Sequence, residues 1–170
     1  MDTDSEHSDA FFQKYMPGNV CFGCGHSNDD GLQIKSYWQG DECVCIWQPE
    51  KKHQGWPEIT CGGIIATLID CHCMASAMAT AIRNENRALG SDPEYRFATG
   101  TLHIKYLKPT SIVKPLTLIA KVTDIKNQRI YTLHCDLFAE NQKTVEAEVT
   151  AFLVYSSEQE NSDSSDFNAK

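Results

Sequence analysis

The residue types most able to do chemistry lie in residues 53–71, HQGWPEITCGGIIATLIDC. Gly62 and Gly63 open a helical pattern there. Glycine lets a ligand approach the backbone closely, and the first N–H groups of a helix have no partner within it. With the positive end of the helix dipole, these donors predict an anion or oxyanion site. A glycine pair that only eases a tight loop-to-helix turn is the alternative.

Asp70 lies within the apolar run that follows, beside Ile69 and Cys71. At 100° per residue it falls next to the helix face of Gly63, at the side of the apolar stripe. An ionised carboxylate in such a place is costly unless it is paired. We interpret Asp70 as a catalytic carboxylate, with a satisfied buried acid that caps a nearby loop as the alternative.

Spacing adds a requirement. Gly62 and Asp70 are eight residues apart, or about 12 Å along a helix axis. An oxyanion donor and a base must converge to about 3 Å from one reacting carbonyl. Two such helices packed antiparallel across a two-fold axis would bring Gly62 of one chain to Asp70 of the other. A catalytic interpretation therefore requires a dimer.

The chain has eight cysteines, among them the pair Cys21 and Cys24 and the run Cys71-His72-Cys73. A zinc site usually needs four ligands as two close pairs, whereas neighbours on a helix point in different directions. We therefore expect thiols that fill small apolar sites, with no metal and no cofactor. A metal or redox module built on Cys21 and Cys24 is a second alternative.

Most of the net charge of −8 lies at the two ends of the chain. Residues 1–9 hold four acidic groups, and residues 156–170 hold four more with one lysine, which leaves the remainder at −1. This balance argues against a nucleic-acid partner. The acidic N-terminus is unlike an export signal and no apolar run resembles a membrane span, so we expect a cytoplasmic protein that does not bind membranes.

The elements that must position these residues follow from periodicity. We expect a short helix at 9–16, an ordered loop at 21–32, another loop at 53–60 and a helix of about 24 residues from Gly62. Strands are expected at 32–38, 42–48, 98–107, 116–126, 129–140 and 144–155. The order predicts an α+β fold, a curved antiparallel sheet wrapped around one long helix. Residues 1–19 form a tail with the short helix, 20–155 the domain and 156–170 a disordered acidic tail.

The stretch CGGIIATLID resembles the signature of PaaI-type hotdog thioesterases, a His-Gly-Gly followed by six residues and an acid. It is most similar to the human thioesterase-superfamily-member branch. CFGCGHSNDDGL resembles the CFxCGxxNPxGL opening of bacterial members. Lys108-Pro109, which follows the strand expected at 98–107, is a third point of resemblance. Together these features extend the resemblance over about residues 20–155.

The resemblance implies hydrolysis of acyl-CoA thioesters at sites shared across a homodimer, alone or as a dimer of dimers. Gly62 matches the glycine whose N–H polarises the thioester carbonyl, and Gly63 matches its neighbour. Asp70 matches the general base or nucleophile. Thr99 falls where the family has a Ser or Thr that positions water, and Thr101, two residues on, is a weaker candidate. Basic residues near the Lys-Pro turn, Lys105, Lys108 and Lys114, would face the CoA phosphates.

Two positions depart from the family pattern. The histidine before the glycine pair is Cys61 here, and a thiol is a weak hydrogen-bond donor. Cys61 as a nucleophile would need a base and an electropositive site. His53 is a candidate for the missing imidazole, and an asparagine of some relatives is replaced by Gly55. These changes leave a non-catalytic acyl or acyl-CoA binding hotdog protein as the alternative function.

Overall fold

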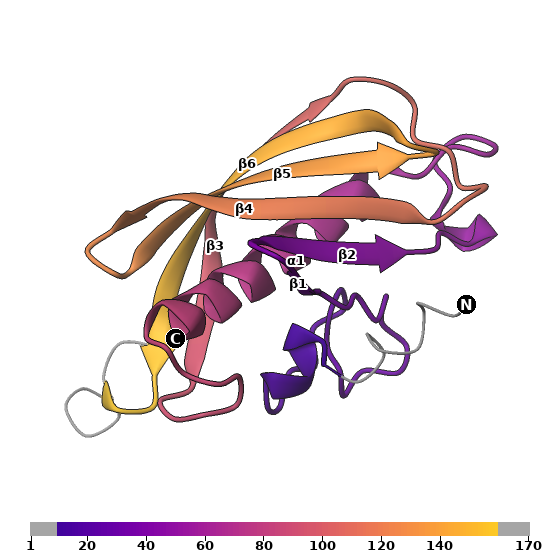
Figure 1. Cartoon of the computed structure of the whole chain (residues 1–170). Coiled ribbons are helices and arrows are strands. Elements are labelled where there is room, and N and C mark those ends of the chain that lie inside the picture. The colour runs from indigo at the N-terminus through magenta and orange to yellow at the C-terminus, as the bar shows by residue number, and fades with distance from the viewer. Residues whose placement is uncertain (1–9, 160–170) are drawn as a thin grey trace, which may run out of the picture.

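The structure is a computed structural model that describes residues 10–159. A curved six-stranded antiparallel sheet wraps around one long helix (Figure 1). The strand order is β1-β2-β4-β5-β6-β3. The elements are β1 (Tyr37–Gln39), β2 (Glu42–Trp47), α1 (Gly62–Asn84), β3 (Tyr95–Tyr106), β4 (Leu116–Lys126), β5 (Ile130–Ala139) and β6 (Gln142–Ser156), with short 3₁₀ helices at Phe12–Tyr15 and Lys51–His53. The predicted α+β hotdog architecture is confirmed.

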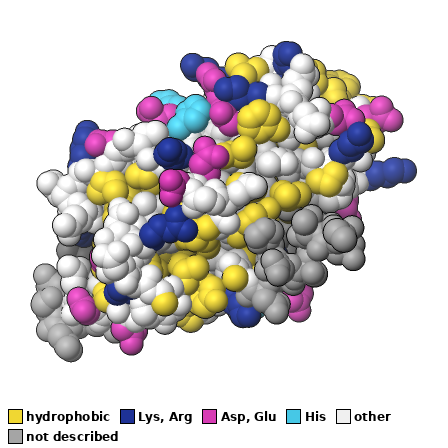
Figure 2. Space-filling view, in the orientation of Figure 1, with side chains coloured by type: hydrophobic (Ala, Val, Ile, Leu, Met, Phe, Trp, Pro, Cys, Tyr) yellow, Lys and Arg dark blue, Asp and Glu magenta, His cyan; other side chains and the backbone are white. Residues whose placement is uncertain are grey.

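The inner face of the sheet and α1 form the core. Side chains on a strand alternate between faces, and the inward set on β4, β5 and β6 is buried and mostly small or aliphatic, for example Leu118, Leu133 and Val149. The outward face has mixed charges, as Figure 2 shows. On this face the Nζ of Lys143 lies 3.3 Å from Asp136 Oδ1 and 3.8 Å from Glu146 Oε2. Interspersed charges of both signs leave no single-sign surface on this face.

Helix α1 is covered unevenly along its length. Residues 71–79 are all buried, and their many alanines let the sheet approach closely. The first nine residues differ, because Gly63 is exposed and Ala66 and Asp70 are half-buried. These three residues recur at helical spacing, so they form one open stripe along α1. By length and composition α1 could cross a membrane, but most of its apolar stretch is buried inside the fold, as in a core helix.

Near the N-terminus the structure corrects two predictions. The strand expected at 32–38 begins only at Tyr37. Gln33 has a positive φ of 52° and its side chain donates 2.9 Å to the Gly25 carbonyl, so this stretch folds back on the loop at 21–32. The helix expected at 9–16 is a 3₁₀ turn that begins after Phe11, and Asp9, the first residue of the expected helix, lies outside the described residues.

At the C-terminal end, β6 reaches Ser156, the first residue assigned to the acidic tail. The next residue, Ser157, accepts a hydrogen bond of 2.9 Å from the Glu94 N–H. The start of the predicted tail is therefore ordered, and residues 160–170 lie outside the part that the structure describes.

Candidate active site

The N-terminus of α1 carries uncapped backbone donors. Cys61 occupies the N-cap position but makes no side-chain hydrogen bond to the first turn. Its own N–H donates 2.8 Å to the His53 carbonyl, and its carbonyl accepts 3.1 Å from Ile65. A serine or aspartate at this position would normally occupy a donor of the first turn. The N–H groups that begin α1 therefore remain free to face a ligand.

The glycine pair is not required by contacts within this chain. Neither Gly62 nor Gly63 has a positive φ. A Cβ on Gly62 would lie 3.6 Å from the Tyr106 ring, an ordinary contact, and one on Gly63 would meet only the Cys61 sulfur, at 3.8 Å. Within residues 10–159 nothing explains why larger side chains are absent here. The free space favours close approach by a ligand or by a second chain.

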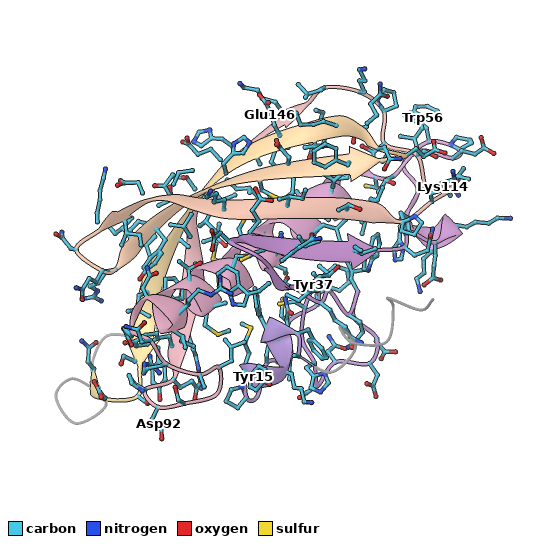
Figure 3. The ribbon with its side chains drawn as sticks, viewed as in Figure 1. Tyr15, Tyr37, Trp56, Asp92, Lys114 and Glu146 are labelled. Atoms are coloured by element: carbon cyan, nitrogen blue, oxygen red, sulfur yellow. The ribbon has the colours of Figure 1, made fainter. Side chains whose placement is uncertain are left out.

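A cavity of about 470 Å³ opens beside these donors. Its lining includes Trp56, Cys61, Gly62, Ile65, Tyr106 and Lys108. Trp56 is 78% exposed, and it lies at the opposite end of the molecule from Asp92 (Figure 3). An apolar wall with one lysine suits a ligand that is partly apolar and partly anionic. Lys114, by contrast, lines a separate cavity of about 430 Å³ over the outward face of β4 and β5.

Asp70 and Thr99 are brought together as a pair. The Thr99 hydroxyl donates a hydrogen bond to the Asp70 Oδ1. Asp70 is half-buried and Thr99 is exposed, so the pair lies at the open edge of the fold. A carboxylate that is held by one hydrogen bond and still reached by water has the geometry of a general base. The role predicted for Asp70 stays a prediction, and its contact with Thr99 gives it a defined orientation.

Thr101 is turned away from Asp70, contrary to the prediction that it shares the side of Thr99. Thr99 pairs with Ala151, which is fully buried, while Thr101 pairs with Thr150 and donates 2.8 Å to its hydroxyl on the outward face. The cause is a β-bulge, in which Gly100 is an extra residue in β3. A bulge interrupts the two-residue alternation on which the prediction rested.

His53 is buried rather than presented to the cavity. Its ring packs on Trp47 at 4.8 Å between centroids, and its Nδ1 accepts 2.9 Å from the Glu50 N–H. Burial lowers its pKa, which favours the neutral ring. The proposed substrate-binding role for this imidazole finds no support in these contacts. His53 instead holds the loop before α1, through the carbonyl that binds Cys61.

The two halves of the site lie apart within one chain. Gly62 borders the cavity, whereas neither Asp70 nor Thr99 lines it. The same separation is seen on β3, where Thr99 reaches Asp70 and Tyr106, near the other end of the strand, donates 2.8 Å to the Gly62 carbonyl. Among residues 10–159, β3 is also an edge of the sheet and pairs with β6 alone. Both halves therefore border a strand with one unpaired side.

Three site residues were not identified from sequence: Trp56, Gly100 and Tyr106. Tyr106 had a usable signal, because it ends an alternation with Leu102 and Ile104 that places all three on the inner face. Burial raises the pKa of the Tyr106 hydroxyl, which keeps it a donor. Gly100 between two threonines had a weaker signal, since glycine inside a strand often marks a bulge. No sequence signal pointed to Trp56, because its loop reaches the cavity only once the chain has folded.

Comparison with known proteins places this geometry in a family. The family profile described as "Thioesterase superfamily" matches residues 59–146. A thioesterase superfamily protein from Shewanella loihica is 31% identical, with 72% of this chain and 91% of that chain covered and a TM-score of 0.59. No curated protein matches the chain.

Two other solved structures share the fold. Thioesterase superfamily member 2 from Mus musculus is 16% identical, covering 72% of this chain and 84% of that chain with a TM-score of 0.57. A hypothetical thioesterase solved with coenzyme A, from Streptococcus pneumoniae, is 14% identical, covering 72% and 90% with a TM-score of 0.56. The profile match extends over more than half of the sequence and includes the glycine pair, Asp70 and Thr99. The chain therefore belongs to the thioesterase superfamily.

Proposed function

We propose that this protein is an acyl-CoA thioesterase whose active sites form between two copies of the chain. The observation that carries the proposal is the Asp70 carboxylate, held by Thr99 beside the unpaired edge of β3. Family membership supports thioester chemistry. In the proposed dimer, the uncapped start of the partner's α1 supplies the oxyanion donor, and the cavity beside it supplies the space for substrate, neither of which Asp70 has next to it within its own chain.

Asp70 acts as the general base in this proposal. Its carboxylate takes a proton from a water molecule as that water attacks the thioester carbonyl carbon. Thr99 orients the carboxylate and adds a hydrogen bond that a charged acceptor makes strong. The tetrahedral intermediate then collapses, the carbon–sulfur bond breaks, and the CoA thiolate leaves and is protonated. General-base assistance of this kind contributes roughly 10²–10⁴-fold in rate.

The N–H at the start of the partner's α1 stabilises the oxyanion. A single donor of this type typically contributes about 3–4 kcal/mol to transition-state stabilisation. Cys61 leaves these donors unoccupied, and the glycine pair leaves room for the carbonyl oxygen. The cavity at Trp56 and Tyr106 would receive the thioester, and Lys108 at its wall would pair with a CoA phosphate. A structural relative solved with coenzyme A is consistent with this ligand class.

The edge strand supports the dimer. β3 is twelve residues long, and its side away from β6 has no strand partner among the described residues. A long unpaired edge is a template for pairing with another chain. Pairing of β3 with a second β3 across a two-fold axis would bring the two α1 helices alongside each other. Gel filtration with light scattering should then give twice the 19.1 kDa chain mass.

Replacing the base tests the proposal first. Asp70→Asn keeps the side-chain shape and its contact with Thr99 but removes the proton acceptor. We expect kcat for a panel of acyl-CoA substrates to fall by roughly 10²–10⁴-fold with an unchanged circular dichroism spectrum. Release of free CoA thiol measures the rate. Retained hydrolysis by a folded variant would remove Asp70 from the mechanism, and wild-type binding of acyl-CoA without turnover would support the non-catalytic alternative.

Replacing the donor tests the other half. Proline is favoured at the first helical position and has no N–H, and Cys61, with φ −58° and ψ 133°, already has the backbone that precedes proline. Gly62→Pro should therefore keep the helix and lower kcat by roughly 10²–10³-fold. Gly62→Ala, which keeps the N–H, is the matched control and should lose less.

Mixing the two variants tests the shared site. A dimer of one Gly62→Pro chain and one Asp70→Asn chain has one intact site if base and donor come from different chains. Co-refolded mixtures should then regain activity that neither variant has alone. If both groups served the same chain, mixed dimers would have no intact site and activity would not return.

A further inference from the structure

Three thiols that the proposed hydrolysis does not use converge beside Asp70. Cys21 and Cys24 belong to the loop before β1, and Cys71 follows Asp70 in α1. Their three Sγ atoms lie within 4.8 Å of one another, and the Sγ atoms of Cys21 and Cys71 are 3.8 Å apart. The sulfur contact between Cys21 and Cys71 thus joins residues that are 50 positions apart in sequence.

The backbone is shaped around these sulfur atoms. The Gly23 N–H donates 3.3 Å to Cys21 Sγ, and the Asn19 amide donates 3.5 Å to Cys24 Sγ. The side-chain Oδ1 of Asn19 in turn accepts a hydrogen bond of 3.0 Å from the Cys21 N–H. Donors aimed at ligand atoms are the usual support of metal-binding thiolates. Thiols that only fill apolar space do not need such donors.

Gly23 shows that the convergence is built into the loop. A Cβ at this position would overlap Cys71 Sγ and lie 2.9 Å from the Thr67 methyl group. Only glycine lets the loop lie flat enough on α1 for the three sulfur atoms to meet.

We propose that Cys21, Cys24 and Cys71 bind one Zn²⁺ ion. Zinc takes thiolates at about 2.3 Å in a tetrahedron, which places the sulfur atoms about 3.8 Å apart. Cys21 and Cys71 already have this separation, and the third sulfur needs to move by about 1 Å. Cys21 is exposed, so the fourth position faces solvent and takes a water molecule. Each thiol releases its proton as it binds the metal.

The directions of neighbouring helix residues do not by themselves exclude a zinc site here. Cys71, His72 and Cys73 do point in different directions, as expected, and the other two are fully buried. Cys71 alone is enough to complete a three-thiolate site, because the pair Cys21 and Cys24 lies over the position of Cys71 on α1. The ion would clamp the loop onto α1 next to the carboxylate, independently of whether the protein hydrolyses thioesters.

Metal binding by the full chain tests the proposal without an activity assay. Reduced protein reconstituted with Zn²⁺ should retain one zinc per chain through gel filtration, measured by mass spectrometry of the metal. Co²⁺ in its place should give the near-ultraviolet absorption of thiolate-to-cobalt charge transfer. Zinc should also protect Cys21 from alkylation by iodoacetamide in the native wild-type protein, a readout that needs no variant.

Variants define the ligands. Cys21→Ser, at an exposed position, should weaken zinc binding beyond the 10–100-fold typical of lost supporting groups, and Asn19→Ala should fall within that range. Cys61→Ser removes a thiol outside the cluster and should retain zinc. Equal zinc retention by a folded Cys21→Ser/Cys24→Ser variant would overturn the proposal. Copper retained in competition with zinc, or a Cys21–Cys24 disulfide formed in the presence of zinc, would overturn it as well.

Discussion

At the scale of single residues, the orientation of Asp70 depends on one hydroxyl. Thr99 donates to its carboxylate, while Thr101, of the same type and strand, donates to Thr150 on the outward face. Loss of a hydrogen bond to a charged group costs about 1.5–3 kcal/mol. We expect Thr99→Val to lower kcat by roughly 10–100-fold with little change in KM. Thr101→Val is the matched control and should hydrolyse acyl-CoA at the wild-type rate; equal losses in the two variants would refute the positioning role.

The residue scale also shows what sequence could predict. Asp70 and the glycine pair were proposed as site residues because acids and paired glycines are conspicuous in an apolar helix, and their roles stay predictions. Thr99 followed from the family resemblance, and its contact with Asp70 agrees with the prediction that they share a site. The side of the strand predicted for Thr101 was wrong because a β-bulge depends on how two strands pair, which the sequence of one strand does not show. The role predicted for His53 stays a prediction, and its burial was not foreseen because it depends on packing against Trp47, which no local pattern reveals.

At the scale of elements, two glycines that look alike in sequence should respond oppositely. Gly63→Ala puts a methyl group into open space at the start of α1, so it should raise the free energy of unfolding, by up to about 1 kcal/mol. The same methyl group occupies the space proposed for substrate, so kcat/KM should fall by about 10²-fold.

Gly100→Ala is the contrasting variant. Its Cβ would overlap the Phe152 ring, which should cost about 1–3 kcal/mol of stability, and displacement of Thr99 should lower activity too. Urea denaturation and CoA release measure both quantities. A stabilised Gly100→Ala variant, or a fully active Gly63→Ala variant, would contradict the roles given to the bulge and to the open stripe of α1.

The element boundaries were predicted correctly where the hydrophobic periodicity is long and uninterrupted. The strand expected at 116–126 matches β4, and the helix expected from Gly62 ends close to Asn84. The strand at 32–38 was too long, since Gln33 adopts a left-handed conformation that its alternating neighbours conceal. Non-local hydrogen bonds decide such a segment, and they are invisible to a local pattern.

At the scale of the whole molecule, a buried polar network joins three parts of the chain. The Ser36 hydroxyl lies 2.8 Å from His72 Nδ1, the His72 Nε2–H donates 3.1 Å to the Cys43 carbonyl, and the Gln13 amide donates 3.0 Å to Ser36. The N-terminal 3₁₀ turn, β2 and α1 are thus tied through one neutral imidazole. Burial lowers the pKa of His72 to about 4, well below the value of about 6.5 expected in an unfolded chain.

This network predicts acid sensitivity. Below pH 6.5 the unfolded chain binds a proton at His72 that the folded protein does not bind until about pH 4. The contribution of His72 to the free energy of unfolding should therefore be constant above this window and fall by up to about 3 kcal/mol as the pH drops through it. Chemical denaturation in chelator-containing buffer checks this. His72→Asn should have a shallower slope between these pH values, and an unchanged slope would exclude His72 as the source.

The bulge in β3 also matters for the design of other proteins with the same two contacts. Thr99 and Tyr106 stand an odd number of positions apart, and on a regular strand they would point to opposite sides of the sheet. The extra residue at Gly100 changes the parity, so a single strand holds both the carboxylate and the carbonyl at the start of the helix. Anyone grafting this pair of contacts onto an unbulged strand would have to choose an even spacing.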